Sequence, residues 1–235
     1  MKLRHSELSL PARDTWLPAR LAHAPDARGL CLIWQTFADP ADRDLEPPLA
    51  EAFQQTGHAT LMLDLLSATQ WRDPDARYNI AALGERALAA LEWIHHQPDL
   101  AMLPLGIFAA DTAAAAAIRV AAQRPDRIAA LGLFAGRPDL AGGAPLRALR
   151  TPTCFIVGQD DPRLPTLRQV FDLIAATRDW RTTAGAEPEQ MSAALLAVGA
   201  DIAAAWMQSH LPARPGDRNA APRAPGASFP PAPEK

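Results

Sequence analysis

The stretch Leu105-Gly-Ile-Phe-Ala-Ala-Asp111-Thr-Ala-Ala-Ala-Ala-Ala117 joins an apolar run to an alanine-rich run, with a single acidic residue between them. The apolar run predicts a strand over 104–109 that is buried on both faces of a sheet. The alanine-rich run predicts a helix over 111–123. A strand that turns directly into a helix is the unit from which parallel sheets are built. This stretch therefore predicts a β–turn–α unit with Asp111 at the turn.

The same alternation of apolar runs and amphipathic stretches continues on both sides of this unit. Strands are expected at 3–10, 15–22, 29–34, 59–65, 104–109, 128–134, 153–157 and 180–183. Helices are expected at 47–56, 79–96, 111–123, 164–176 and 187–210. Single helices between strands imply parallel crossovers. The sequence thus predicts an α/β fold, with a doubly wound, mainly parallel sheet and helices on both faces.

Composition narrows the class of protein. The chain has 235 residues and 49% hydrophobic residues, which is enough for one large domain with a sizeable core. The net charge of −3 gives no electrostatic reason to expect a nucleic-acid partner. No apolar run approaches the roughly 20 residues of a membrane helix, and the first residues lack the features of a secretion signal. Cys31 and Cys154 lie in separate apolar runs, as reduced core thiols of a cytoplasmic protein would.

Residues 211–235 differ from the rest of the chain. They hold seven of the 23 prolines and carry a net charge of +2. Such a stretch cannot bury enough apolar surface to offset the entropy of ordering it. We expect an α/β domain over 1–210 and a disordered or polyproline-like tail over 211–235.

Ligands of open parallel sheets bind at the loops that follow the carboxyl ends of the strands. Here those loops are residues 34–39, 109–113, 135–139 and 158–161. The candidate binding residues in and near them are Trp34, Gln35, Thr36, Ala110, Thr112, Arg137, Asp139 and Pro188. Neither a GxGxxG fingerprint nor a P-loop is present, so no nucleotide, metal or other cofactor is expected. A small-molecule ligand or a protein partner is the expected occupant.

Four motifs occur in the order and spacing of a known family. They are Ala59-Thr-Leu-Met-Leu-Asp-Leu-Leu66, Ala87-Leu-Ala-Ala-Leu-Glu-Trp93, Gly136-Arg-Pro-Asp-Leu-Ala-Gly142, and Pro152-Thr-Cys-Phe-Ile-Val-Gly158 with Asp161. Over residues 5–210 the chain resembles the dienelactone-hydrolase-like branch of the α/β-hydrolase superfamily. The resemblance implies an eight-stranded hydrolase fold. The 18 residues between Phe134 and Thr153 are too few for a cap domain.

The resemblance also implies where a Ser-His-Asp triad would lie. The family's Gly-x-Ser-x-Gly elbow corresponds to Ala109-Ala110-Asp111-Thr112-Ala113, so an aspartate replaces the serine nucleophile. Gln35-Thr36 replaces the usual His-Gly of the oxyanion loop, and Asp161 occupies the place of the acid. The place of the catalytic histidine is Pro188, and residues 182–207 contain no histidine. We therefore expect a chain that has lost the triad and works as a binding or partner protein.

Other interpretations of these residues remain open. Asp111 is either the N-cap of the following helix or the nucleophile or base of a hydrolase acting on an ester, lactone or halide. Asp161 is either a relic of the triad acid or a turn residue before Pro162. Arg137 and Asp139 are expected to fix their loop through backbone hydrogen bonds, and Trp34 to fill the pocket floor. A third function is an interaction module that acts through the proline-rich tail.

Overall fold

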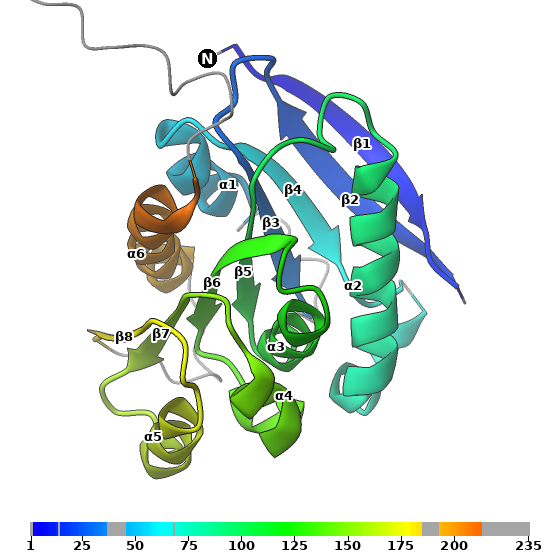
Figure 1. Cartoon of the computed structure of the whole chain (residues 1–235). Coiled ribbons are helices and arrows are strands. Elements are labelled where there is room, and N and C mark those ends of the chain that lie inside the picture. Colours follow the sequence, from blue (N-terminus) through cyan, green and yellow to red (C-terminus); the bar gives the residue numbers. More distant parts are fainter. Residues whose placement is uncertain (1, 14, 37–45, 68, 185–192, 213–235) are drawn as a thin grey trace, which may run out of the picture.

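A single eight-stranded sheet organises the molecule (Figure 1). The computed structural model describes residues 2–13, 15–36, 46–67, 69–184 and 193–212. The strand order is β1-β2-β4-β3-β5-β6-β7-β8. The strands are β1 (Arg4–Pro11), β2 (Trp16–His23), β3 (Leu30–Gln35), β4 (Ala59–Asp64), β5 (Leu105–Ala110), β6 (Ile128–Phe134), β7 (Thr153–Gly158) and β8 (Arg178–Thr183). Strands β3 to β8 pair in parallel, and β1 and β2 add an antiparallel ribbon at one edge. The predicted fold class is confirmed.

Helices cover the two faces of the sheet unequally. In Figure 1, α2, α3, α4 and α5 lie on one face, and α1 and α6 lie on the other. The helices are α1 (Glu46–Gln55), α2 (Ile80–His95), α3 (Ala113–Gln123), α4 (Gly143–Ala148), α5 (Leu164–Asp172) and α6 (Ala193–His210). Short 3-10 turns are η2 (Gln70–Arg72), η3 (Ala76–Tyr78) and η4 (Pro138–Ala141).

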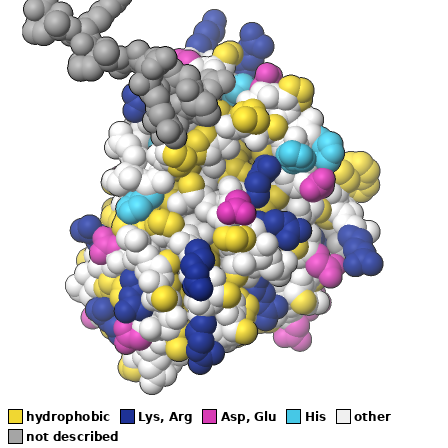
Figure 2. Space-filling model, viewed as in Figure 1, with side chains coloured by type: hydrophobic (Ala, Val, Ile, Leu, Met, Phe, Trp, Pro, Cys, Tyr) yellow, Lys and Arg dark blue, Asp and Glu magenta, His cyan; other side chains and the backbone are white. Residues whose placement is uncertain are grey.

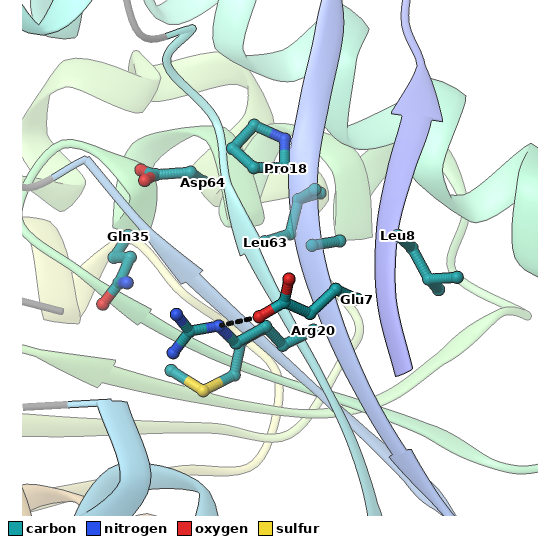
Figure 3. A pocket seen from close by; sticks show the side chains of 9 residues that line it. Glu7, Leu8, Pro18, Arg20, Gln35, Leu63 and Asp64 are labelled. Atoms are coloured by element: carbon teal, nitrogen blue, oxygen red, sulfur yellow. Dashed lines mark ion pairs between the residues drawn. The ribbon is translucent and has the colours of Figure 1, made fainter. Parts of the chain in front are cut away.

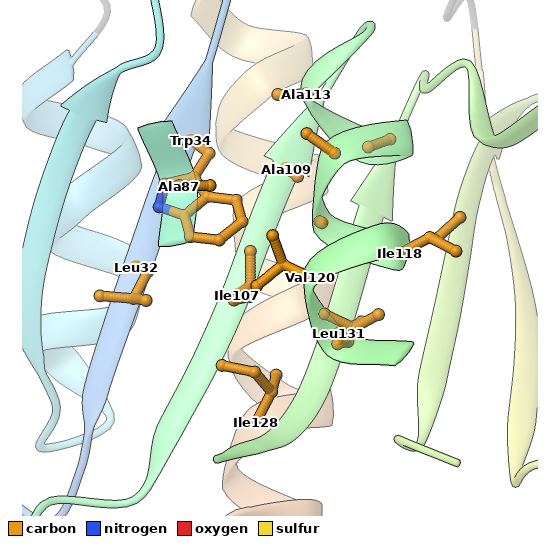
Figure 4. Close-up of a cluster of buried hydrophobic side chains, with 14 of the residues drawn as sticks. Leu32, Trp34, Ala87, Ile107, Ala109, Ala113, Ile118, Val120, Ile128 and Leu131 are labelled. Carbon is orange, nitrogen blue, oxygen red and sulfur yellow. The ribbon is translucent and has the colours of Figure 1, made fainter. Parts of the chain in front are cut away.

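Two hydrophobic clusters fill the space on either side of the sheet. Alternate residues of β3 enter different clusters, Leu32 and Trp34 on the α2/α3 side and Ile33 on the α1/α6 side. Every residue of β3 is buried, which is why this strand is a continuous apolar run in the sequence. Figure 4 shows Trp34 on the α3 side of the sheet, near Ala87 of α2.

Helix α3 packs unusually close to the sheet. Alanines 113–117 are all fully buried, and the small side chains let the helix axis approach β5. Gly136, in the loop after β6, comes so near this helix that an added Cβ would lie 2.5 Å from the Cβ of Ala114. The expectation that the alanine run serves packing is confirmed.

The structure differs from the sequence expectations at several element ends. Helix α4 was not predicted, because its Gly-Ala-Pro start has a composition typical of loops. Helix α5 ends at Asp172 rather than at residue 176. Helix α6 is described from Ala193, and residues 185–192 of the expected 187–210 helix lie outside the described part of the chain. Residues 213–235 lie outside it too, whereas Leu211 packs against the α1/α6 cluster.

Cys31 and Cys154 are both buried and unbridged, as expected for core thiols. In the described part of the chain, none of the helices combines the length and apolar character that crossing a membrane requires. Basic and acidic side chains are interspersed over the face shown in Figure 2.

Candidate functional site

The turn between β5 and α3 has the backbone of a strained elbow. Asp111 has a φ of +49°, in the left-handed region that non-glycine residues rarely adopt. Two neighbouring amides hold this turn, because the Asp111 carbonyl oxygen accepts from Ala114 N at 3.2 Å and from Arg137 N at 3.0 Å. The elbow predicted from the sequence is thus present, although alanines stand at the two positions where the family has glycines.

The N-cap interpretation of Asp111 is wrong. The N-cap of α3 is Thr112, and the helix begins at Ala113. An N-cap residue whose side chain accepts from the first turn has extended backbone angles, which a φ of +49° does not provide. The Asp111 carboxylate instead faces a cation, with 4.0 Å between its Oδ2 and Nη1 of Arg77. Its side chain is 20% exposed, so it lies at the surface of the elbow and within reach of a ligand.

Arg77 was not singled out in the sequence. It lies on η3, in the connection between β4 and α2, where no motif distinguishes it from other arginines. Its guanidinium also lies 5.1 Å from the centre of the neighbouring Tyr78 ring, and Tyr78 is 45% exposed. The elbow carboxylate therefore has a half-exposed cation and a phenol ring beside it.

A pair of buried hydroxyls joins the loop after β3 to the elbow. Thr36 and Thr112 are both fully buried, and their Oγ1 atoms are 3.0 Å apart. This hydrogen bond fixes the start of the loop after β3 against the first turn of α3. In the family that the sequence resembles, this loop carries the oxyanion donors. The sequence prediction named both residues as binding candidates, but their hydroxyls hold the two loops together instead of pointing to solvent.

The other predicted binding residues near β3 and β5 are also largely buried. Trp34 and Ala110 are part of the core, and Gln35 is 7% exposed. The carbonyl oxygen of Gln35 accepts from Leu65 N at 3.2 Å, and the residue lines a small cavity with Asp64 at the ends of β3 and β4 (Figure 3). Trp34 therefore supports the loops from below, within the packed core.

Asp161, at the place of the triad acid, accepts hydrogen bonds from Arg163 on both carboxylate oxygens. Its Oδ1 accepts from Arg163 N at 2.8 Å and from Arg163 Nε at 3.0 Å, and its Oδ2 accepts from Arg163 Nη2 at 2.7 Å. The carboxylate has no exposed surface. Burial alone would raise the pKa of Asp161, but the hydrogen bonds and charge of Arg163, with the charge of Arg137, outweigh burial and lower it. Asp161 is thus an ionised turn residue before Pro162, and the arginine occupies both of its oxygens.

Arg137 and Asp139 form a second pair of the same kind. Arg137 donates from Nη2 to Oδ2 of Asp139 at 2.7 Å and from Nε to Oδ1 at 3.0 Å. The hydrogen bond to Asp139 raises the pKa of Arg137, burial partly opposes it, and the Asp139 and Asp111 charges add to the rise. Backbone bonds also fix this loop, including the one from Arg137 N to the elbow carbonyl. The loop is thus fixed by its backbone bonds together with a side-chain pair, and ligand contact by Arg137 or Asp139 stays a prediction.

The structure therefore gathers Asp111, Arg137, Asp139 and Asp161 at the carboxyl ends of β5, β6 and β7, as the topology predicts. Pro188 lies outside the described residues. No group of three or more His, Cys, Asp or Glu side chains within the described ranges could hold a metal ion.

The described histidines lie away from the elbow. His58 directly precedes β4 and therefore lies at the amino ends of the parallel strands, whereas the elbow lies at their carboxyl ends. Burial lowers the pKa of His58, a hydrogen bond with the backbone of Phe53 partly offsets this effect, and the charge of Arg28 adds to the lowering. His95 and His96 end α2, and His210 ends α6.

Asp111 does not line any of three cavities formed by described residues, although one of them reaches Gln35 at the end of β3. Two of them adjoin β1, β2 and β4, and one lies between β8 and the end of α6.

Comparison with known proteins identifies the fold of this arrangement. No protein-family model matches the sequence. Two Mycobacterium tuberculosis proteins, from strains H37Rv and CDC 1551 and each named "Putative phosphoribosyl transferase", are 34% identical to the chain over 167 residues. The match covers 71% of this chain but only 38% of each relative.

The solved structures are similar over almost the whole chain. A dienelactone hydrolase from Anabaena variabilis superposes with a TM-score of 0.82 at 27% identity, and covers 90% of this chain and 100% of its own. An esterase domain from Rhodothermus marinus gives a TM-score of 0.68 at 15% identity, with 88% and 99% covered. A cold-adapted esterase from an Arctic intertidal metagenomic library gives 0.69 at 14% identity, with 90% and 96% covered. The chain therefore has the α/β-hydrolase fold in its dienelactone-hydrolase-like form.

Proposed function

We propose that this chain is a non-catalytic α/β-hydrolase-fold protein that binds a small molecule or a protein partner at the loops around Asp111. The observation that carries the proposal is the state of Asp161. In a triad this carboxylate orients a histidine, but here Arg163 takes both oxygens at 2.7–3.0 Å inside a fully buried site. A histidine would have to displace an arginine that neutralises the buried charge.

The other triad positions support the same proposal. An aspartate stands at the nucleophile's place, and residues 182–207 contain no histidine that could act as base. Serine-type acyl transfer requires both groups. What the elbow offers instead is a partly exposed carboxylate beside Arg77, a surface suited to hydrogen-bond a polar ligand.

A second candidate function is a hydrolase that uses Asp111 as its nucleophile. The observation that favours it is the positive φ of Asp111, because strained backbone is retained most often at functional sites. In such a reaction a carboxylate oxygen of Asp111 attacks the substrate carbon and displaces the leaving group. Water must then hydrolyse the resulting ester, a step that needs a base. The carboxylates that share this end of the strands, Asp139 and Asp161, are each paired with an arginine, so neither is free to act as this base.

Turnover assays distinguish these two functions. The purified protein and its Asp111→Ala variant would be assayed with a short-chain p-nitrophenyl ester, a lactone and a bromoalkane. We expect equal rates near background for both proteins. Asp179→Ala, at the exposed edge strand β8, serves as a matched control for loss of a surface carboxylate. Turnover that disappears only in Asp111→Ala would refute the non-catalytic proposal and establish the aspartate-based hydrolase.

Binding at the elbow is tested separately. A library of small polar compounds would be screened by thermal shift, and each compound that stabilises the protein would be retested with Asp111→Ala and Arg77→Ala. A ligand at the elbow loses its stabilising effect in both variants and keeps it in Asp179→Ala. If every stabilising compound acts equally on all variants, the elbow is not the binding site.

The name of the mycobacterial relatives is not extended to this chain. Most of each relative lies outside the matched region, so a phosphoribosyl transferase activity has no assigned place within the part that is shared.

A further inference from the structure

A groove lies on the face of the sheet that carries only two helices. It consists of two adjoining cavities of about 500 and 140 Å³, which share Glu7, Arg20 and Met62. The groove runs between the β1–β2 ribbon and helix α1, from His5 and Thr60 at one end to Gln35 and Asp64 at the other. Because β2 contributes Pro18 to Ala22, the groove is about 14 Å long at 3.4 Å per strand residue. We call it the β1–β2 groove.

The groove has an apolar floor and an acidic rim. Ala22, Ala50 and Met62 are each less than 10% exposed and form the floor. Glu7 and Glu51 lie on the rim on opposite sides, one on β1 and one on α1. Figure 3 shows Glu7 facing Arg20, with 3.9 Å between Oε1 and Nε. With Asp64 at the far end, the lining carries three carboxylates and one arginine.

The chain leaves the described structure close to one end of this groove. Leu211 packs against the α1/α6 cluster, and its side chain lies within 3.5 Å of the place where a Cβ on Gly29 would be. The carbonyl oxygen of Gly29 accepts from Ala59 N, at the start of β4, and the next residue, Thr60, lines the groove. The residues that follow Pro212 therefore start one strand away from the groove.

We propose that segment 213–235 binds back into the β1–β2 groove of its own chain. The segment is rich in proline and carries a net charge of +2, opposite in sign to the lining. As a polyproline helix of 3.1 Å per residue, its 23 residues span about 70 Å, several times the length of the groove. A proline-rich chain loses little entropy on binding, because its polyproline conformation is already largely formed. This is a contact within the chain and is independent of the elbow site.

The test uses a cysteine placed in the groove. Cys31 and Cys154 are buried, so a thiol reagent at neutral pH reports on the introduced residue. His5→Cys places the thiol on the groove side of β1, because His5 alternates in step with Glu7. Glu92→Cys is the control, because Glu92 lies on α2, on the opposite face of the sheet, and its side chain is exposed. Labelling rates are compared between the full chain and a chain that ends at Pro212.

We expect the His5→Cys thiol to react at least about threefold more slowly in the full chain than in the shortened chain. Tethering gives the segment an effective concentration on the order of 1 mM, so a dissociation constant near 0.5 mM is enough for this protection. The Glu92→Cys thiol should react equally in both chains. Adding 0.5 M NaCl, or Glu7→Gln together with Glu51→Gln, should reduce the protection, whereas Glu92→Gln on the opposite face should not.

Two results would overturn the proposal. Equal labelling of His5→Cys in the full and shortened chains means that the groove is not covered by the segment. Protection that rises with protein concentration between 1 and 100 μM means that a second copy supplies the occupant, and light scattering would then show association.

Discussion

Replacing Arg163 with alanine isolates a buried charge at the end of β7. Asp161 has no exposed surface, and two of its three short hydrogen bonds come from the Arg163 guanidinium. The third, from the Arg163 backbone N, survives the substitution. Removing one partner of a buried ion pair costs about 3–5 kcal/mol. We expect the lower value, about 3 kcal/mol, because the backbone bond remains and 23% of the arginine side chain is exposed.

The loss should depend on pH in a direction fixed by the pKa of Asp161. In the wild type this pKa is lowered, so its contribution to stability is complete above the unfolded-state pKa and disappears as pH falls through the lower folded-state pKa. In Arg163→Ala burial acts without its main opposing cation, which raises the pKa. The penalty of the buried charge is then relieved as pH falls toward the unfolded-state value. The two unfolding free energies should therefore converge between pH 7 and pH 4.

Urea unfolding followed by tryptophan fluorescence at pH 7 and pH 4 measures both effects. Arg181→Ala is the matched control, since it breaks the pair with Asp179 on an exposed strand, where the cost should stay within about 1 kcal/mol. A loss in Arg163→Ala that equals the control, or that is the same at both pH values, would refute the reasoning. It would mean that Asp161 is not the ionised, arginine-dependent carboxylate described above.

Three further predictions concern packing, backbone strain and the reactivity of the two thiols. Gly84→Ala, where an added Cβ meets nothing within 4 Å, should raise the free energy of unfolding by about 0.5–1 kcal/mol, and Gly199→Ala, where it lies 2.5 Å from a β6 phenyl ring, should lower it by about 1–3 kcal/mol. The same urea assay tests both, and equal signs would contradict the packing described. Asp111→Gly should be more stable than wild type by up to about 1 kcal/mol because it relieves the positive φ, whereas a less stable variant would show that the side chain stabilises the elbow. Burial raises the pKa of Cys31 and brings that of Cys154 to about 12, so a thiol titration at pH 8 should find no reactive group in the native protein and two after unfolding.

The parts of the fold that could be predicted are those where one sequence pattern admits one structure. The runs that became β3, β5 and β7 are apolar throughout because both faces of each strand are covered. Helix α4 escaped prediction because its short Gly-Ala-Pro-Leu start has no helical periodicity and tertiary contacts stabilise it. Local pattern therefore identifies the buried elements and misses those that depend on the packing around them.

The candidate site was predicted in position but not in contacts. The topology places Asp111, Asp139 and Asp161 together as expected, because the carboxyl ends of parallel strands lie on the same side of the sheet. The partner of Asp111 could not be found, since Arg77 comes from a short 3-10 turn in the connection between β4 and α2, where no sequence motif distinguishes it. The partner of Asp161 left a signal that was overlooked. Asp161-Pro-Arg163 and Arg137-Pro-Asp139 both place opposite charges on either side of a proline, and both close into an ion pair.

The buried ion pair between Arg163 and Asp161 also limits which substitutions this sequence can accept during evolution. A serine at 111, a histidine within 185–192 and the loss of the arginine would all be needed before a conventional triad could operate. The first two changes bring no catalytic gain alone, and the third is expected to cost about 3 kcal/mol of a total stability that is typically only 5–15 kcal/mol. Selection for hydrolysis could act only after the protein had tolerated this loss of stability, because no activity would appear before all three changes were present. Single substitutions in this chain are therefore expected to change what it binds more readily than to create a serine-type triad.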